Sequence, residues 1–132
     1  MKKQIEVSSY IYVLVMVLAF FCSTAFSQEF INGDFNDRIA KDIVAVEFWA
    51  DWNKTNQFND LAKLKDCSVY RLDIMANADT QAKYDVSAIP TVIIFESGQE
   101  KARFNANIMF QLEADKKKVQ HSVDTIMLNK FQ

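Results

Sequence analysis

The sequence has few of the residues that shape tight turns or bind metals. Its 132 residues include two glycines, one proline, two cysteines and one histidine. Few turns can therefore depend on the backbone conformations that glycine and proline favour. His121 has no second histidine and no cysteine near it in the sequence, so we expect no metal site and no bound cofactor.

A strong charge of either sign is also missing. The chain has 15 basic and 17 acidic residues, and no stripe of basic residues runs along it, so we expect no nucleic-acid binding. Half of the residues are hydrophobic and 13% are aromatic, which excludes a disordered chain. The length allows one domain.

The first 27 residues are typical of an export signal. Two lysines precede an unbroken apolar run over residues 10–21, and Ala25 and Ser27 are the small residues at the two positions that a signal peptidase reads. We therefore expect cleavage before Gln28. The remaining chain, residues 28–132, would be a domain in the periplasm or in the external medium.

Two other interpretations of this segment compete with cleavage. Residues 7–26 carry no charge and are long enough to span a bilayer, so an uncleaved segment would anchor the protein in the membrane. Cys22 would be the acceptor of a lipoprotein signal. However, Phe21 stands where that signal has Gly, Ala or Ser, so we discount the lipoprotein.

Cleavage would leave a single cysteine and a net charge of −3, because Lys2, Lys3 and Glu6 leave with the signal. Cys67 then has no partner for an internal disulfide, although exported proteins meet oxidising conditions. We interpret Cys67 as a small buried hydrophobic residue. Its alternative is a reactive thiol that pairs with another protein.

Two continuous apolar stretches predict buried strands. Ile43–Trp49 is the longer one, and a strand without polar alternation is buried on both faces at the centre of a sheet. Thr91–Phe95 is the second, followed by a hairpin turn over Glu96–Gln99 and a return strand over 101–105. In an open α/β sheet, a ligand lies at the carboxyl end of a central strand.

Weaker patterns predict the remaining elements. They are an edge strand over Glu29–Asn32, a helix capped by Asp34 that buries Phe35 and Ile39, an amphipathic helix over Lys54–Leu64, an alternating strand over Val69–Ile74, a short helix over Asp79–Tyr84, and a helix over Phe110–Lys130 with Leu112, Val119, Val123, Ile126 and Met127 facing inward.

Two motifs in this sequence resemble those of the thioredoxin family. The first, Val46-Glu47-Phe48-Trp49-Ala50-Asp51-Trp52-Asn53-Lys54-Thr55-Asn56, is similar to the family's active-site strand and turn, V-[DE]-F-W-A-x-W-C-x-x-C. The second, Tyr84–Thr91, is similar to the family's Y-x-[VI]-x-x-[IV]-P-T loop, whose proline follows a cis peptide. The resemblance covers residues 30–130 and implies an α/β thioredoxin-like fold, with a central mixed sheet flanked by helices.

The chain departs from the family pattern at the residues that carry its chemistry. Asn53 and Asn56 stand where the motif has its two cysteines, and an amide can neither ionise to a thiolate nor attack a disulfide. We interpret Asn53 as the N-cap of the following helix. That helix should be about two turns shorter than usual, because only fourteen residues separate Asn56 from Arg71. Asn105 replaces a family glycine, and asparagine tolerates a left-handed backbone.

Glu47 matches the family's buried acid, which assists proton transfer at the cysteine. Without that cysteine, we interpret it as a structural residue paired with Arg71 across adjacent strands, since an unpaired charge in an apolar strand is costly. Trp49 and Trp52 match the family's two tryptophans, and each is interpreted as either a packing or a partner-contact residue.

The resemblance also implies where a partner would bind, because the family holds extended peptides by backbone hydrogen bonds at the cis-proline loop. The corresponding cleft consists of Trp49, Trp52, Asn53, Ile89, Pro90 and Asn105. We therefore hypothesise a non-redox binding module for a protein or an extended peptide. Two alternatives stay open: a single-thiol oxidoreductase that uses Cys67, and a purely structural subunit.

Overall fold

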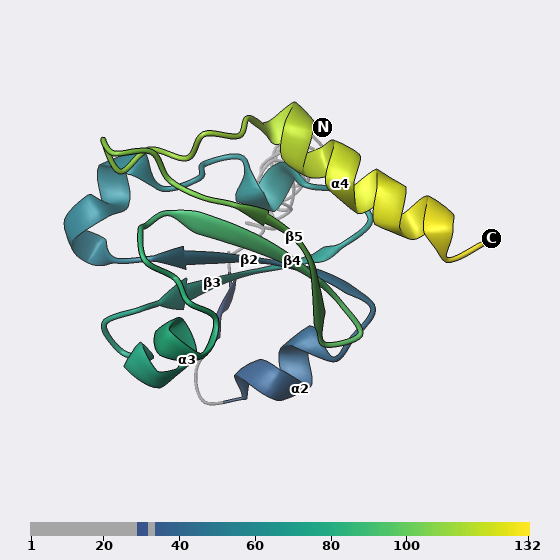
Figure 1. Cartoon of the computed structure of the whole chain (residues 1–132), viewed down its shortest axis with the longest axis horizontal. Coiled ribbons are helices and arrows are strands. Elements are labelled where there is room, and N and C mark those ends of the chain that lie inside the picture. Colours follow the sequence, from purple (N-terminus) through teal and green to yellow (C-terminus); the bar gives the residue numbers. More distant parts are fainter. Residues whose placement is uncertain (1–28, 32–33) are drawn as a thin grey trace, which may run out of the picture.

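The structure, a computed structural model, describes residues 29–31 and 34–132 and is built on one mixed β-sheet (Figure 1). The predicted export signal and the alternative membrane anchor lie outside these residues. The five strands are β1 (Glu29–Phe30), β2 (Ile43–Trp49), β3 (Ser68–Asp73), β4 (Thr91–Glu96) and β5 (Gln99–Phe104), in the order β1-β3-β2-β4-β5. Strands β1, β2 and β3 are parallel, and β4 is antiparallel to both β2 and β5. β2 is the central strand, as predicted.

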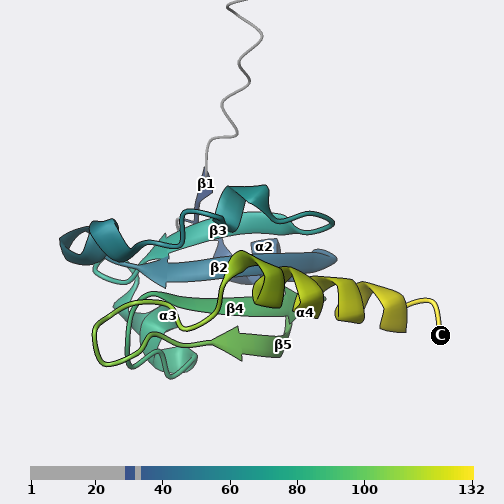
Figure 2. The ribbon, with the colours of Figure 1, turned by 90° about the horizontal axis from the view of Figure 1, so that it is seen from above.

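Helices cover both faces of this sheet, which confirms the predicted fold class. Helices α2 (Phe35–Ile39) and α3 (Ala78–Lys83) lie on one face. Helix α4 (Lys116–Asn129) lies on the other face, together with the 3₁₀ turns η1 (Asp51–Asn56) and η2 (Leu61–Lys63) (Figures 1 and 2). Within the described residues, no helix is both long and apolar enough to cross a membrane.

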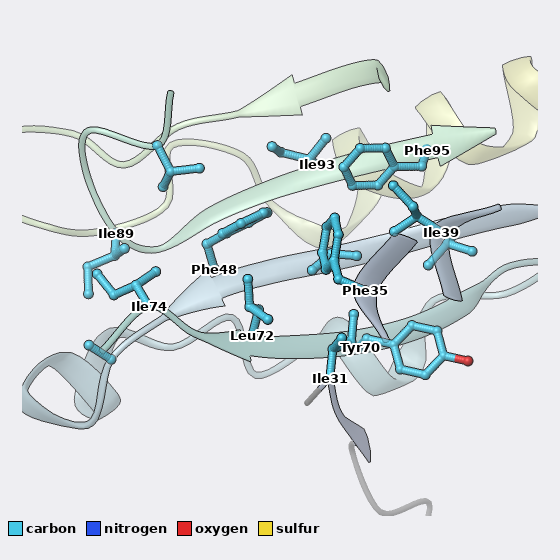
Figure 3. Close-up of a cluster of buried hydrophobic side chains, with 14 residues drawn as sticks. Ile31, Phe35, Ile39, Phe48, Tyr70, Leu72, Ile74, Ile89, Ile93 and Phe95 are labelled. Atoms are coloured by element: carbon cyan, nitrogen blue, oxygen red, sulfur yellow. The ribbon is translucent and has the colours of Figure 1, made fainter. Parts of the chain in front are cut away.

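Each face of the sheet has its own hydrophobic core, and β2 contributes to both. Val44, Val46 and Phe48 face the α2 and α3 side, where Phe48 packs near the ring of Phe35 (Figure 3). Ile43 and Ala45 face the α4 side. Successive strand residues point to opposite faces, so a strand covered on both sides needs the unbroken apolar sequence that β2 has.

The hairpin between β4 and β5 has the predicted turn. Ser97 and Gly98 both have a left-handed backbone, with φ of 51° and 85°, and Glu96 pairs with Gln99. Two consecutive left-handed residues are characteristic of a type I′ turn, whose twist matches that of the strands. The return strand begins at Gln99, two residues earlier than predicted.

The predicted helix over Lys54–Leu64 is wrong. Two 3₁₀ turns replace it, separated by an extended residue, Gln57, with φ −58° and ψ 150°. Because β3 runs parallel to β2, the connection must return to the amino end of the sheet, over roughly 20 Å for a strand of this length. The Phe58 N–H donates to the Glu47 carboxylate (2.6 Å) and not to a carbonyl four residues earlier, so a continuous helix is interrupted there. The apolar positions Phe58, Leu61 and Leu64 are still buried.

The last helix is shorter than predicted, because it begins at Lys116 and not at Phe110. Asp115 caps it by accepting a hydrogen bond from the Lys118 N–H (2.8 Å). Val119 and Val123 are buried as predicted, but residues 105–115 form a loop. An N-cap residue placed directly before the apolar periodicity was the signal that could have located this boundary.

At the other end of the chain, Asp34 precedes α2 as predicted but does not cap it. The Asp34 carboxylate accepts a hydrogen bond from the Arg38 side chain instead (3.0 Å). Helix α3 begins one residue earlier than predicted.

Candidate binding site at the carboxyl end of strand β2

Three loops meet where β2 ends, and the side chain of Asn53 joins them. Its Nδ2 donates hydrogen bonds to the carbonyl oxygens of Ile89 (3.2 Å) and Phe110 (3.1 Å). Its Oδ1 accepts a hydrogen bond from Asn56 Nδ2 (2.9 Å). A primary amide has two N–H donors, so Asn53 hydrogen-bonds both carbonyls, and the residue is only 8% exposed.

The predicted role of Asn53 as a helix N-cap is therefore wrong. Ala50 is the residue that precedes η1, and Asn53 lies inside the turn with φ −117° and ψ 22°. Its amide faces the carbonyls of other loops rather than the N–H groups of its own turn.

The second of these loops carries Pro90, and the Ile89–Pro90 peptide is cis, as the family motif implied. The Ile89 side chain is only 3% exposed and belongs to the hydrophobic core. This corrects its assignment as a cleft side chain, because Ile89 presents its backbone carbonyl to the site. Pro90 is buried, and Thr91 Oγ1 closes the loop by donating to the Ala88 carbonyl (2.7 Å).

The third loop, residues 105–113, is called the cover loop here. Ala106 and Leu112 form an antiparallel bridge, and Asn107 Oδ1 accepts hydrogen bonds from the N–H groups of Met109 and Gln111. The loop leads from β5 toward α4 past the end of β2 where η1 lies (Figure 1). The helix predicted from Phe110 onward included the second half of this loop, so Phe110 was missed as a site residue.

Phe110 gives the cover loop its contact with the site. Its ring meets the Trp52 ring edge-on, at 5.6 Å between centroids and 85° between planes. The backbone at Phe110 is left-handed, with φ 56°. Asn105, which stands where the family motif has a glycine, is not among the residues with a positive φ. It lies exposed at the base of the loop, where its carbonyl accepts from the Glu113 N–H (3.2 Å).

Several apolar side chains at this edge of the molecule face solvent. Trp52 is 61% exposed and Phe110 is 46% exposed, and on the cover loop Ile108 and Met109 are 97% and 67% exposed. Large apolar side chains that are exposed together mark interaction surfaces. Trp49 differs from Trp52, since it is half-buried and its ring lies 5.7 Å from the guanidinium of Arg71.

Glu47 and Arg71 form the buried ion pair that the sequence predicted. Arg71 Nε donates to Glu47 Oε2 (2.8 Å), and the Phe58 N–H donates to Glu47 Oε1 (2.6 Å). The Arg71 guanidinium also donates to the Phe58 carbonyl (3.4 Å). Burial raises the pKa of the Glu47 carboxyl above its ordinary value, while Arg71 and the Phe58 N–H counteract part of that rise.

This pairing gives a stability prediction. Glu47→Leu should lower the free energy of unfolding by roughly 3–5 kcal/mol, because it leaves the buried Arg71 guanidinium without its carboxylate. Adding Arg71→Met should recover much of that loss, since the two apolar side chains can pack together. Urea titration of the two variants and the unaltered protein measures both effects. A single variant as stable as the unaltered protein would contradict the pairing.

Cys67 lies at the opposite end of the sheet from Asn53. Ser68, the next residue, pairs with Val44 near the start of β2, whereas Asn53 follows the end of that strand. Burial raises the pKa of the Cys67 thiol to about 11, and the carboxylates of Asp66 and Asp124 add to the rise. The strand register therefore places Cys67 outside the site. Its raised pKa keeps the thiol protonated at neutral pH, and a protonated thiol is a poor nucleophile.

The Cys67 pKa predicts slow alkylation of the folded protein. Because a raised pKa leaves the thiol protonated, the rate with iodoacetamide should climb about tenfold for each pH unit between about pH 8 and pH 10. Thiol alkylation of residues 28–132, followed by mass spectrometry, measures this rate. The urea-unfolded chain serves as the control and should react faster at about pH 8, since its thiol has the ordinary pKa of about 8.5. A plateau below about pH 9 in the folded protein would contradict the assignment.

Within residues 29–31 and 34–132, no three acidic, histidine or cysteine side chains lie close enough together to hold a metal ion. His121 is exposed on α4, pointing outward as the helical spacing predicted.

A parallel β1-β3-β2 arrangement, an antiparallel β4–β5 hairpin and a cis-proline loop beside the end of the central strand together define a thioredoxin-like domain. The family model described as Thioredoxin matches residues 27–118, so the chain belongs to the thioredoxin family.

Its relatives include bacterial thioredoxins. The thioredoxin of Staphylococcus epidermidis RP62A is 33% identical over 75 residues, covering 52% of this chain and 72% of the relative. The thioredoxin of Staphylococcus aureus Mu50 is 32% identical with the same coverage.

Solved structures show the same fold. A mutant thioredoxin of Halobacterium salinarum NRC-1 superposes with a TM-score of 0.60 at 20% identity, covering 74% of this chain and 87% of that one. The thioredoxin of Malassezia sympodialis gives a TM-score of 0.58 at 22% identity, covering 75% of this chain and 90% of that one. At these identities the likeness establishes the fold alone.

Proposed function

We propose that this protein is an exported, redox-inactive binding module that holds an extended segment of a protein partner beside Pro90. The observation that carries the proposal is the amide of Asn53, which stands at a cysteine position of the family motif and hydrogen-bonds two backbone carbonyls. A carbonyl-binding amide next to an exposed tryptophan suits non-covalent recognition of polypeptide.

Dithiol exchange fits this site poorly. The reaction needs one thiolate to attack a disulfide and a second thiol to resolve the mixed disulfide. Asn53 and Asn56 occupy the two motif positions and hydrogen-bond each other, and Cys67 directly precedes β3 at the other end of the sheet, with a raised pKa. These observations favour the binding module over the single-thiol enzyme.

Export is supported by the sequence of the first 27 residues. Amino-terminal sequencing of the protein from its native host should give Gln28 as the first residue. An intact amino terminus would favour the membrane-anchored alternative.

The absence of dithiol chemistry predicts that residues 28–132 do not accelerate the reduction of insulin disulfides by dithiothreitol. A turbidity assay with an active thioredoxin as the positive control measures this. Turnover that survives Cys67→Ser would contradict the redox-inactive site, while turnover abolished by that change would favour the single-thiol enzyme.

A binding role for Trp52 predicts that Trp52→Ala weakens partner binding with little change in stability, because the side chain is mostly exposed. Truncating an interfacial tryptophan commonly costs about 2 kcal/mol or more, which is about thirtyfold in affinity. Partners are first captured from the native envelope and identified by mass spectrometry. The affinity of each purified variant for these partners is then measured, together with the melting temperature of the variant.

Leu128→Ala is the matched control, since Leu128 is an exposed apolar residue near the far end of α4. It should leave partner affinity unchanged. Unchanged affinity in Trp52→Ala together with a lower melting temperature would instead identify a structural subunit.

A further inference from the structure

The cover loop places one of its own residues on the proposed binding site. Phe110 offers its carbonyl oxygen to Asn53 Nδ2 (3.1 Å) and its ring to Trp52 (5.6 Å between centroids). A backbone carbonyl and an aromatic side chain are also what an extended peptide could offer to the same two residues.

The contact is made at a strained residue. Phe110 has φ 56°, a left-handed backbone that a bulky side chain adopts at a cost and that glycine adopts freely. Strain of this kind persists only where surrounding contacts enforce it. Three contacts act on this residue: the hydrogen bond from Asn53, the edge contact with Trp52, and the hydrogen bond from the Phe110 N–H to the Asn107 carbonyl (3.0 Å).

Residues 107–111 of the loop are not built into either core, whereas Leu112 packs against the core on the α4 side. Ile108 and Met109 at the tip of the loop are exposed. The conformation of the loop is held by contacts within it, namely the Ala106–Leu112 bridge and the hydrogen bonds to the Asn107 side chain. Residues 107–111 can therefore leave Asn53 and Trp52 without removing large apolar side chains from the interior.

We propose that the cover loop is a built-in pseudo-ligand, with Phe110 occupying the place of an aromatic residue of the partner. This inference rests on the proposed function, and it specifies the partner's chemistry: an extended segment that presents an aromatic side chain to Trp52 and a backbone carbonyl to Asn53. A tethered competitor acts at millimolar effective concentration, so the partner must displace Phe110 to bind.

The test uses a fluorescent peptide with the sequence of residues 105–113 as the probe. In a shortened variant, an Asn-Gly pair replaces residues 107–111, since a two-residue turn can join the antiparallel pair Ala106 and Leu112. The peptide should bind this variant at least about tenfold more tightly than the unaltered protein, measured by fluorescence anisotropy. The same peptide carrying Phe110→Ala should bind the variant at least about tenfold more weakly.

A second variant, Phe110→Gly, keeps the loop length and suits the left-handed backbone while removing the ring from Trp52. It should also bind the peptide more tightly than the unaltered protein, and it decides the test if the shortened variant does not fold. Adding Trp52→Ala to either variant should abolish the gain. Equal binding by all forms, or no binding by a folded variant, overturns the pseudo-ligand.

The two proposals fail in different ways. Partner affinity that ignores Trp52→Ala defeats the proposed function, whatever the peptide does. Partner affinity that depends on Trp52 but is no higher in the variants with an altered cover loop defeats the pseudo-ligand alone.

Discussion

The carboxylate of Glu47, buried at the centre of the sheet, is the interaction on which the connection after β2 depends. One carboxylate oxygen accepts a hydrogen bond from the Phe58 N–H, and the other accepts one from Arg71 Nε. The Arg71 guanidinium also donates to the Phe58 carbonyl. A helix would have satisfied these backbone groups internally, but this segment has only two short 3₁₀ turns. The ion pair therefore replaces helical hydrogen bonds in the connection between β2 and β3. This lets a partly extended segment run back over the α4 side of the sheet.

Sheet topology then brings three distant segments to one edge. β4 is antiparallel to β2, so its start lies beside the end of β2, and β5 is antiparallel to β4, so its end lies there as well. The turn after β2, the loop before β4 and the loop after β5 meet for this reason. Asn53, Ile89 and Phe110 contribute one hydrogen-bonding group each from these three loops.

The strands, the motif residues and the β4–β5 hairpin turn were predictable from the sequence, whereas the connections after β2 and after β5 were not. An unbroken apolar run identifies β2, and strand pairing explains why Glu47 needs Arg71, so both followed from local pattern and charge. Helical spacing near Phe58 was misleading because the two 3₁₀ turns and the chain between them bury the same apolar positions, Phe58, Leu61 and Leu64, that a helix would bury. The cover loop was missed because Phe110 and Leu112 extend the apolar spacing of the last helix toward its amino end, although both lie in a loop before Lys116.

Asn53 stands at a position where the family motif has a cysteine, and its amide offers hydrogen bonds that a thiol does not. A thiol has one weak S–H donor and forms its strong link covalently, whereas an amide has two N–H donors and a carbonyl acceptor. Asn53 uses its donors and its acceptor at once, with three partners that a thiol could not hold together in this way. In the proposed function, a ligand held through such hydrogen bonds would leave without a reductant, so competition among segments would set the occupancy of the site. In the proposed arrangement, the cover loop is the competitor that is always present.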